Sequence, residues 1–288
     1  MEDEDQVARA GGVRLVFGAS GYIGSHLVLR LRDRGYTVRA VSRNRAVLEG
    51  REWAGVECAG ADALDPASLA PVMQGVDVAW YLVHSMAAGR EFGTLDQRAA
   101  LNFRDAAARA KVKRIVYLGG LTPDDPDSQH LRSRLETGEI LRQGPVPVTE
   151  IRAGMIIGPG SAAFEVMRDL VNYLPVMITP RWVASKSPPI ALDDLLTYLT
   201  EVAEIPEAAG QIYDAPGPEY LSYAELMRRL GRVLGRKTLI IPVPLLTPRL
   251  WPRIGRARCR PTGSRDRYAA VISNLGTRFM PSGPRMLR

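Results

Sequence analysis

Short apolar runs alternate with amphipathic stretches along the first half of the chain. Runs rich in β-branched residues are typical of strands buried on both faces, whereas apolar residues repeating every three or four positions are typical of helices. The predicted strands are 13–17, 36–41, 56–61, 78–83, 113–118 and 148–152. The helices predicted between them include 25–31, 66–74, 92–110 and 128–142. A β-α unit repeated in this way predicts an α/β fold with a doubly wound parallel sheet.

The pattern changes after Gly154, where prolines divide the chain into short pieces. We interpret 154–250 as a small C-terminal cap region that carries late sheet strands and covers the carboxyl ends of the first strands, where open α/β folds bind ligands. Its predicted helices are 162–173, one after Ile190 that is capped at Asp193, and 222–234. The remaining domain predictions are a disordered N-terminus at 1–12, the main domain at 13–153 and a disordered basic tail at 251–288.

Three glycines, Gly18, Gly21 and Gly24, follow the first predicted strand and open the first helix. A strand that turns through glycines into a helix directs free N–H groups and the positive helix end at one place, which suits a pyrophosphate. The spacing is GxxGxxG and differs from the GxGxxG of the usual dinucleotide fingerprint. The alternative is an ordinary glycine-rich turn.

The second predicted strand ends in basic and hydroxyl residues, Ser42, Arg43 and Arg45, with no acid. In dinucleotide-binding folds an acid at this place accepts from the ribose 2′-hydroxyl of NAD, whereas an arginine suits the 2′-phosphate of NADP. The sequence therefore favours NADP(H) over NAD(H). The alternative is a solvated basic loop.

Composition excludes several classes of protein. The 288 residues are 46% hydrophobic and include two cysteines, Cys58 and Cys259, without a CxxC or Cys/His cluster, so we expect no metal site and no disulfide framework. The acidic start and the lack of a spanning apolar run predict a cytoplasmic protein without a transmembrane segment. The formal charge of +7 comes from residues 250–288, which hold nine arginines and one acid, so we expect no nucleic-acid partner.

Several motifs in the same order resemble the short-chain dehydrogenase/reductase superfamily, more narrowly its atypical, extended and NmrA-like branches. The matching segments are 18–24, 62–65, 101–103, 114–117, 189–194 and 217–226. The resemblance covers about residues 13–245 and implies a Rossmann-type fold that binds NAD(P), with Asp62 against the adenine. The cofactor-binding residues that it implies are Gly18, Ser20, Gly21, Tyr22, Ile23, Gly24, Ser42, Arg43, Asp62, Ala63, Leu82, Val83 and His84.

The catalytic pattern of that superfamily is incomplete. Its members typically carry a Tyr-x-x-x-Lys pair on the helix after the fifth strand and a Ser or Thr near the end of that strand, and the Tyr passes a proton to a carbonyl. Here the strand ends in Gly119 and Gly120, and the spacing is matched by His130 and Arg134. Arginine stays protonated near neutral pH, whereas histidine can donate a proton. The candidate catalytic residues are His130, Arg134, His84, Asn102 and Thr122.

Two kinds of function remain open from the sequence. One is an NAD(P)H-dependent oxidoreductase that reduces a small apolar electrophile or a quinone, since the cofactor carries the hydride chemistry. The other is a non-catalytic NAD(P)-binding redox sensor or scaffold and assembly protein, which the missing Tyr favours. An exposed helix residue is the alternative for His130, and a loop residue bonded to backbone is the alternative for His84. A homo-oligomer stays open.

Overall fold

The computed structural model describes residues 12–84, 92–121 and 129–243 and divides them between two compact units. The sheet unit contains the chain up to Ala153 and the later segment Leu192–Ala215. The second unit contains Gly154–Ala191 and the chain from Pro216 onward. The predicted tail at 251–288 and the N-terminal residues 1–11 lie outside the described residues.

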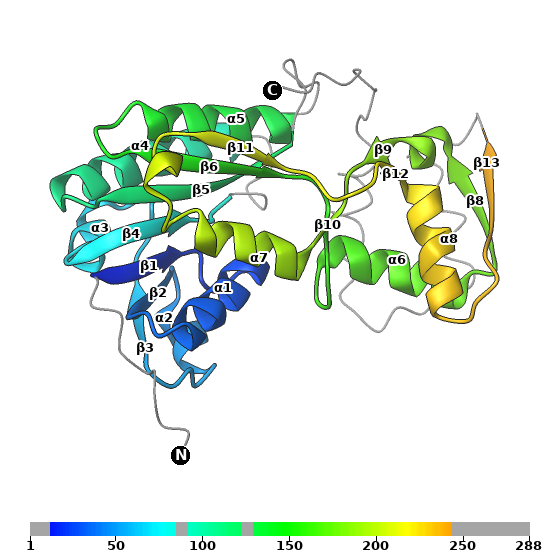
Figure 1. The fold of residues 1–288 in the computed structure, drawn as a ribbon, viewed down its shortest axis with the longest axis horizontal. Helices are drawn as coiled ribbons and strands as arrows, with labels where there is room; N and C mark the ends of the chain where they lie inside the picture. Colours follow the sequence, from blue (N-terminus) through cyan, green and yellow to red (C-terminus); the bar gives the residue numbers. More distant parts are fainter. Residues whose placement is uncertain (1–11, 85–91, 122–128, 244–288) are drawn as a thin grey trace. The chain divides into compact units, whose positions relative to one another are not determined.

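A seven-stranded parallel sheet forms the centre of the sheet unit, as the repeated β-α pattern predicts (Figure 1). Its strands are β1 Val13–Phe17, β2 Val38–Ser42, β3 Val56–Gly60, β4 Val76–Tyr81, β5 Arg114–Gly120, β6 Val148–Ala153 and β11 Ile212–Ala215. The order is β11-β6-β5-β4-β1-β2-β3. The strand order reverses beside β1, and in such sheets a ligand crevice opens there, at the carboxyl ends of β1 and β4.

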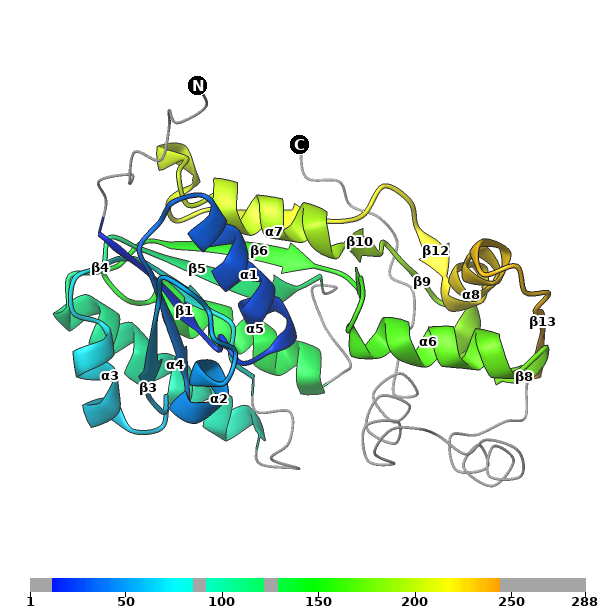
Figure 2. The same ribbon diagram turned by 90° about the horizontal axis from the view of Figure 1, so that it is seen from below.

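Helices cover both faces of this sheet, which is the doubly wound arrangement of a Rossmann-type fold (Figures 1 and 2). The helices of one face are α1 Tyr22–Asp33 and α7 Leu192–Glu201, and those of the other are α3 Pro66–Val72, α4 Phe92–Arg109 and α5 Gln129–Arg142. A short helix, α2 Arg45–Glu49, follows β2 and is absent from the sequence prediction. Asn44 caps it, because its side chain accepts a hydrogen bond from the Ala46 amide at 3.1 Å.

The core beneath α4 and α5 is built around aromatic rings from neighbouring strands. Phe103 of α4 lies 5.2 Å from the ring of Phe17 and 4.7 Å from that of Tyr81, measured between centroids. All three residues are buried. On the α7 face, the buried indole of Trp80 donates a hydrogen bond to the Leu199 carbonyl at 2.9 Å. Phe17 and Tyr81 are the last residues of β1 and β4, so these rings pack at the carboxyl ends of both strands.

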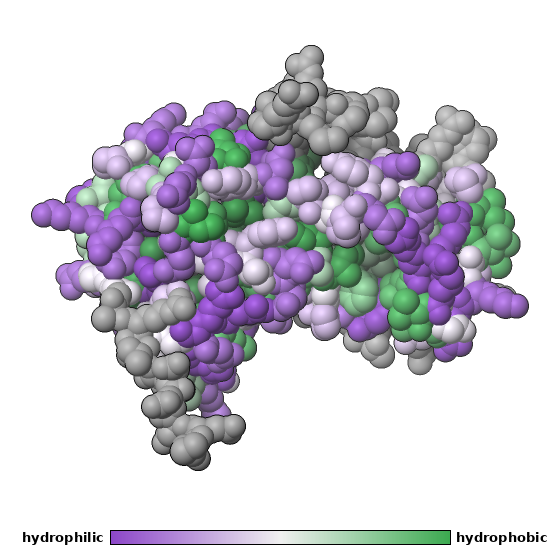
Figure 3. All heavy atoms as spheres, viewed as in Figure 1, coloured by the Kyte–Doolittle hydropathy of each residue, from purple (hydrophilic) through white to green (hydrophobic). Residues whose placement is uncertain are grey.

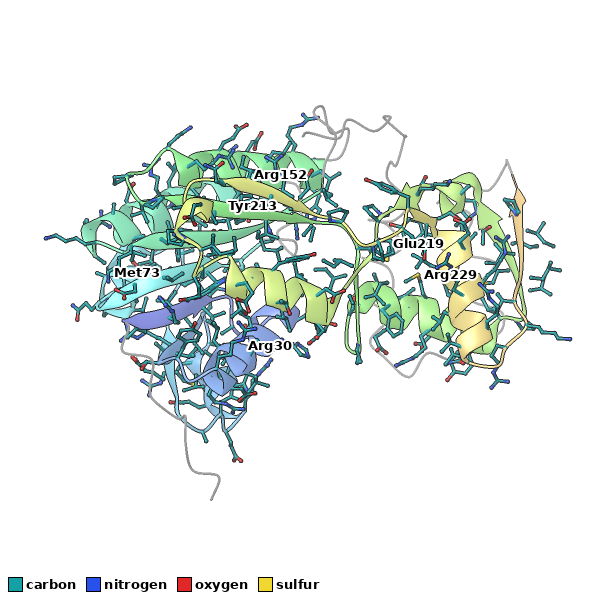
Figure 4. The ribbon with its side chains drawn as sticks, in the orientation of Figure 1. Arg30, Met73, Arg152, Tyr213, Glu219 and Arg229 are labelled. Carbon is teal, nitrogen blue, oxygen red and sulfur yellow. The ribbon has the colours of Figure 1, made fainter. Side chains whose placement is uncertain are left out.

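The segment Leu192–Ala215 belongs to the sheet unit, so the cap region is smaller than the expected 154–250. Strand β11 pairs in parallel with β6, and the Thr149 hydroxyl donates to the Ala208 carbonyl at 2.7 Å. The prediction that Asp193 caps the helix is wrong, because α7 begins one residue earlier, at Leu192. Asp193 instead pairs with Arg30 of α1, which Figure 4 labels.

The described part of the second unit contains two α-helices, a short 3-10 helix at Arg181–Ala184 and three small sheets. Its elements are β7 Ile156–Ile157, α6 Ala162–Tyr173, β8 Val176–Pro180, β9 Lys186–Ser187, β10 Ile190–Ala191, β12 Leu221–Ser222, α8 Tyr223–Val233 and β13 Leu239–Val243. Ser222 and Glu225 form a capping box that starts α8 where the sequence predicts a helix. Glu219 and Arg229 are joined by two hydrogen bonds of 2.8 and 2.7 Å and are labelled in Figure 4.

Strands β8 and β13 of the second unit have one buried and one exposed apolar face. Met177 and Ile240 pack into the core of this unit together with Met167 and Met227 of the helices. The alternate residues Val176, Ile178, Leu239 and Ile241 are exposed, and apolar side chains show on the surface at this end of the unit (Figure 3). In the part of the chain that the structure describes, every helix is too short or too polar to cross a membrane.

Candidate functional site

The loop between β1 and α1 is held against the end of β4 so closely that glycine is required. Gly18 has φ +96°, and a Cβ built on it would lie 2.9 Å from the Leu82 carbonyl oxygen. A Cβ on Gly24 would overlap the carbonyl oxygen of Gly18. These contacts explain the first and the last of the three glycines.

The start of α1 is open to an anion. Gly21 is the N-cap residue of α1 and has no side chain to cap it, and Gly21 and the preceding Ser20 are exposed. The first N–H groups of a helix have no partner inside the helix and carry its positive end. Tyr22 and Ile23 supply the first two of these groups. The cradle fits the pyrophosphate of a dinucleotide.

At the end of β2, only one of the predicted residues is available to a ligand through its side chain. The Ser42 hydroxyl is buried and donates to the Asn44 carbonyl at 2.8 Å, and Arg45 pairs with Glu49 within α2. Arg43 is exposed and makes no hydrogen bond or ion pair with any described residue. Its guanidinium is therefore the free cation at this strand end among residues 12–84.

A second arginine reaches the glycine loop and escaped the sequence reasoning. Arg51 follows α2, and its guanidinium donates to the Ser20 carbonyl at 2.9 Å and lies over the Trp53 ring, 5.1 Å from the centroid. No sequence motif marks Arg51, because its contact with the Ser20 carbonyl depends on where the chain lies relative to α1 when α2 ends.

The loop after β3, which the resemblance places at the adenine, is fixed by hydrogen bonds. Asp62 accepts from the Leu64 amide at 2.9 Å. Asn102 of α4 donates through its amide nitrogen to the Ala63 carbonyl at 2.8 Å. Asn102, predicted as a catalytic candidate, thus braces this loop in the structure.

The end of β4 brings the remaining predicted cofactor residues to the same edge. The Leu82 amide donates to the Phe17 carbonyl at 2.9 Å, and the Val83 side chain lies 3.2 Å from the position of a Cβ on Gly18. His84 follows Val83 in the chain and therefore lies at the carboxyl end of β4, near the glycine loop.

Around His84 the structure gathers six residues that we call the polar cluster: His84, Asp96, Tyr117, His130, Ser133 and Arg134. They come from four places, the end of β4, α4, β5 and α5. The rings of His84 and His130 lie 6.1 Å apart, and those of His84 and Tyr117 lie 6.3 Å apart. The cluster thus places both predicted histidines and Arg134 together.

Asp96 and Ser133 are the buried centre of the polar cluster. The Ser133 hydroxyl donates to Oδ2 of Asp96 at 3.0 Å, and the same oxygen lies 3.8 Å from Nδ1 of His84. Asp96 is 5% exposed and Ser133 is 2% exposed. A carboxylate this deeply buried requires such donors.

Burial and charge set the protonation of both histidines. Burial, and then the Arg134 guanidinium, lower the pKa of His84 to about 4, while Asp96 acts in the opposite direction. The same two causes lower the pKa of His130 to about 4. Both imidazoles are therefore neutral near pH 7 before a ligand enters. The pKa of Arg134 is lowered by burial, but a guanidinium stays charged.

The glycines that end β5 make room for Arg134. A Cβ on Gly120 would lie 3.4 Å from Cδ of Arg134, and the guanidinium donates a long hydrogen bond of 3.4 Å to the Gly119 carbonyl. Tyr117 donates its hydroxyl to the Arg134 carbonyl at 2.9 Å, and burial raises the pKa of this phenol. Arg134 thus occupies the space beside the two glycines that end β5.

The carboxylate of Glu150 on β6 is buried and lies close to Gly119 of β5. Glu150 is 1% exposed, pairs with Arg142 and accepts from Nε of Arg152 at 2.9 Å. A Cβ on Gly119 or on Gly138 would approach its carboxylate oxygens to 2.8 Å. Figure 4 labels Arg152 beside Tyr213 of β11.

Some of the predicted catalytic residues meet in this site and others do not. His84, His130 and Arg134 lie together, Asn102 serves the loop after β3, and Thr122 lies outside the described residues. Sequence reasoning missed Asp96, Ser133 and Tyr117. A signal was available for Asp96, because it falls on the same helical stripe as Ala99, Ala100, Phe103, Ala106 and Ala107, all of which are buried.

Comparison with known proteins supports a dinucleotide site. Residues 18–154, which include the glycine loop and the polar cluster, match the family described as NAD(P)H-binding. The chain is also similar in fold to the crystal structure of Citrobacter sp. triphenylmethane reductase complexed with NADP(H). That similarity has a TM-score of 0.73 and 19% sequence identity, and covers 93% of this chain and 92% of the other. The chain is thus confirmed as similar to NAD(P)-binding proteins of the short-chain dehydrogenase/reductase superfamily.

Two curated relatives differ in what they do. The (4-alkanoyl-5-oxo-2,5-dihydrofuran-3-yl)methyl phosphate reductase of Streptomyces griseus subsp. griseus is 29% identical over 77% of this chain and 74% of its own. The photosystem II assembly factor Ycf39 of Cyanophora paradoxa is 25% identical over 80% of this chain and 71% of its own. The relatives thus include a reductase and an assembly factor.

Proposed function

We propose that this chain is an oxidoreductase of the atypical short-chain dehydrogenase/reductase type. It binds NADP(H) in preference to NAD(H) and reduces a small apolar electrophile or a quinone. One observation carries the proposal: the glycine loop and the polar cluster meet at the carboxyl ends of β1, β4 and β5, within the sheet unit.

The residues present fit the dinucleotide. Gly18, Gly21 and Gly24 let the loop at the start of α1 receive the pyrophosphate, and the exposed Arg43 is available to a ribose 2′-phosphate. Asp62 and Ala63, in the loop after β3, are the residues that we expect against the adenine. A bound reduced nicotinamide supplies the hydride.

The residues of the polar cluster supply the proton. Tyr117 does not suit this role, because its phenol has a raised pKa and already donates its proton to a backbone carbonyl. Arg134 does not suit it either, because a guanidinium does not release its proton near neutral pH. His84 and His130 remain as donors. A quinone suits such a site better than a simple ketone, because a reduced quinone can also take its protons from water.

Two measurements test this function. Titration calorimetry of the full chain with NADPH and with NADH should show binding of both and tighter binding of NADPH. The oxidation of NADPH should then be followed with a benzoquinone and with a small aliphatic ketone, and we expect turnover with the quinone and little with the ketone. Absence of dinucleotide binding would overturn the proposal.

A non-catalytic NAD(P)-binding scaffold or redox sensor is the second candidate. It is favoured by the lack of a Tyr-x-x-x-Lys pair on α5, where His130 and Arg134 hold the corresponding places, and by the similarity to an assembly factor. Tight dinucleotide binding without turnover of quinones, nitroaromatics or enones would favour it over the reductase.

A further inference from the structure

Asp96 has no role in the function proposed so far, although it is the buried acid of the polar cluster. It projects from α4 with 5% of its surface exposed, and its Oδ2 accepts a hydrogen bond from Ser133 of α5 at 3.0 Å. Since ionised groups are costly to bury, a carboxylate held in this way between two helices indicates a specific use.

The nearby imidazole of His84 offers that use. Its Nδ1 is buried and has no hydrogen-bond partner among the described residues, and it lies 3.8 Å from Oδ2 of Asp96. A small rotation of either side chain brings the two atoms within hydrogen-bond distance. An imidazole that directs Nδ1 at a carboxylate presents Nε2 on the other side of its ring.

We propose that Asp96 is a positioning residue for His84: held by Ser133, it accepts the Nδ1–H of His84, so that Nε2 is the nitrogen that takes up a proton and passes it to the reduced substrate. This inference rests on the proposed reductase function, and it adds the residue that selects the histidine and its tautomer.

The step balances as follows in atoms and charge. A bound reduced nicotinamide would supply the substrate with a hydride, which is one hydrogen with two electrons, and would itself be oxidised. The resulting anion takes the proton from Nε2 of the His84 imidazolium, which becomes a neutral imidazole that keeps its Nδ1–H. Asp96 stays ionised throughout, and solvent returns a proton to Nε2 for the next turnover.

The charges that face His84 make Asp96 necessary for this step. Asp96 comes from α4, Tyr117 from β5, and His130 and Arg134 from α5. Arg134, and His130 when it is protonated, oppose an imidazolium at His84, and the neutral phenol of Tyr117 gives it no counter-charge. Among the described residues that face His84, Asp96 is the carboxylate and therefore the group that favours the protonated form.

Nuclear magnetic resonance of the full chain without dinucleotide tests the positioning directly. The chain has three histidines, and the ¹⁵N shifts of each ring report which nitrogen carries the proton. We expect His84 in the Nδ1–H form in the parent, with its signals assigned from His84→Gln. In Asp96→Asn we expect that form to lose its dominance. Asp105→Asn, an exposed acid on the same helix, should leave it intact.

An Nε2–H form of His84 in the parent overturns the proposal, and so does an unchanged tautomer in Asp96→Asn. The parent measurement needs no variant, so it decides the question even if Asp96→Asn fails to fold. Ser133→Ala provides a milder variant that keeps the charge but loses one bond to it, and we expect a partial loss of the Nδ1–H form.

Kinetics add a second readout where turnover is found. Asp96→Asn should lower kcat about 10-fold or more at unchanged KM for the acceptor. It should also move the fall of kcat with rising pH to lower pH, because His84 loses the charge that favours its protonated form. If no acceptor is reduced but the parent shows His84 in the Nδ1–H form, the proposed function is contradicted and the positioning of His84 by Asp96 is not. Turnover whose pH profile is the same in Asp96→Asn would contradict the positioning alone.

Discussion

The glycine loop and the polar cluster lie at the same edge of the central sheet but are built in different ways. The loop is one continuous stretch, Gly18–Gly24, whose shape depends on backbone atoms approaching each other where a Cβ would not fit. The polar cluster takes its side chains from β4, α4, β5 and α5, and depends on how these elements pack. The loop suits an anion through peptide N–H groups, whereas the cluster acts through protons and side-chain charge.

This difference has a consequence for how each region tolerates substitution. A single added methyl group can close the glycine loop, because its neighbours are backbone atoms that have no freedom to move. In the polar cluster the added volume matters less than a change of charge, since its members are buried polar and charged groups that act on one another. Substitutions should therefore separate binding of the dinucleotide from transfer of the proton.

The largest effect is expected in the glycine loop. Gly24→Val places a Cβ onto the Gly18 carbonyl and should abolish dinucleotide binding, because the loop then has to move away from the start of α1. Gly21→Val should do the same by blocking approach of the phosphates, with less effect on the fold. Gly93→Ala, where an added Cβ meets no atom within 4 Å, is the matched control and should bind as the parent does in calorimetry. Binding by Gly24→Val close to that of the parent would contradict the predicted role of the loop.

The sequence predicts the glycine loop well because all its determinants are local. Val13–Phe17, the three glycines and the apolar stripe of α1 lie within about twenty consecutive positions, and each expectation for the loop follows from neighbours in sequence. The polar cluster joins residues from His84 to Arg134 that meet only after four elements have packed. Its histidines could be chosen as candidates, but Asp96 and Ser133 as their partners could not.

The acid stability of the fold should depend on the polar cluster. Burial lowers the pKa of His84 to about 4, below the value of about 6.5 for an unfolded histidine, so the unfolded chain takes up a proton first as the pH falls. The stability linked to His84 is complete above about pH 6.5 and is lost as the pH falls toward about 4, a change of about 3 kcal/mol. Urea unfolding at about pH 7 and about pH 5 should show a smaller difference in His84→Gln than in the parent. In His26→Gln, a change on α1 outside the cluster, the difference should stay as in the parent; equal differences in all three proteins would contradict the burial of a neutral His84.

The two histidines should differ in their effect on turnover. His84→Gln should lower kcat about 100-fold, the scale of general acid catalysis, while leaving NADPH affinity nearly unchanged. His130→Gln should have the smaller effect, because His84 is the proposed proton donor and the ring of His130 lies 6.1 Å from the ring of His84. Quinone reduction that is equally fast in both variants and in the parent would show that the proton comes from elsewhere.

The boundary of the second unit shows another limit of sequence reasoning. The prolines become frequent close to Ala153, where the first stretch of the sheet unit ends, but the return of Leu192–Ala215 to that unit depends on distant pairings such as Tyr213 with Ile151. Two hydrogen bonds from side chains of the sheet to backbone carbonyls of this segment hold it in place, from Thr149 to Ala208 and from Trp80 to Leu199. Nothing in the local pattern of α7 distinguishes a helix of the cap region from one that packs on α1.

The smallest effect is expected at the end of β2, where the ligand contact is exposed. Arg43→Ala should narrow the gap between NADPH and NADH affinity by about 1–3 kcal/mol, the scale of a charge-assisted contact to a phosphate. Arg45→Ala is the matched control. Arg45 is paired with Glu49, so its loss should leave the difference between NADPH and NADH affinity unchanged. Equal affinities for the two dinucleotides in the parent would contradict the NADP(H) preference.

Arg51 supplies the sharper comparison, because its guanidinium already reaches the Ser20 carbonyl at 2.9 Å. If Arg51→Ala closes the gap and Arg43→Ala does not, the cation that selects the phosphate comes from the segment after α2 rather than from the end of the strand.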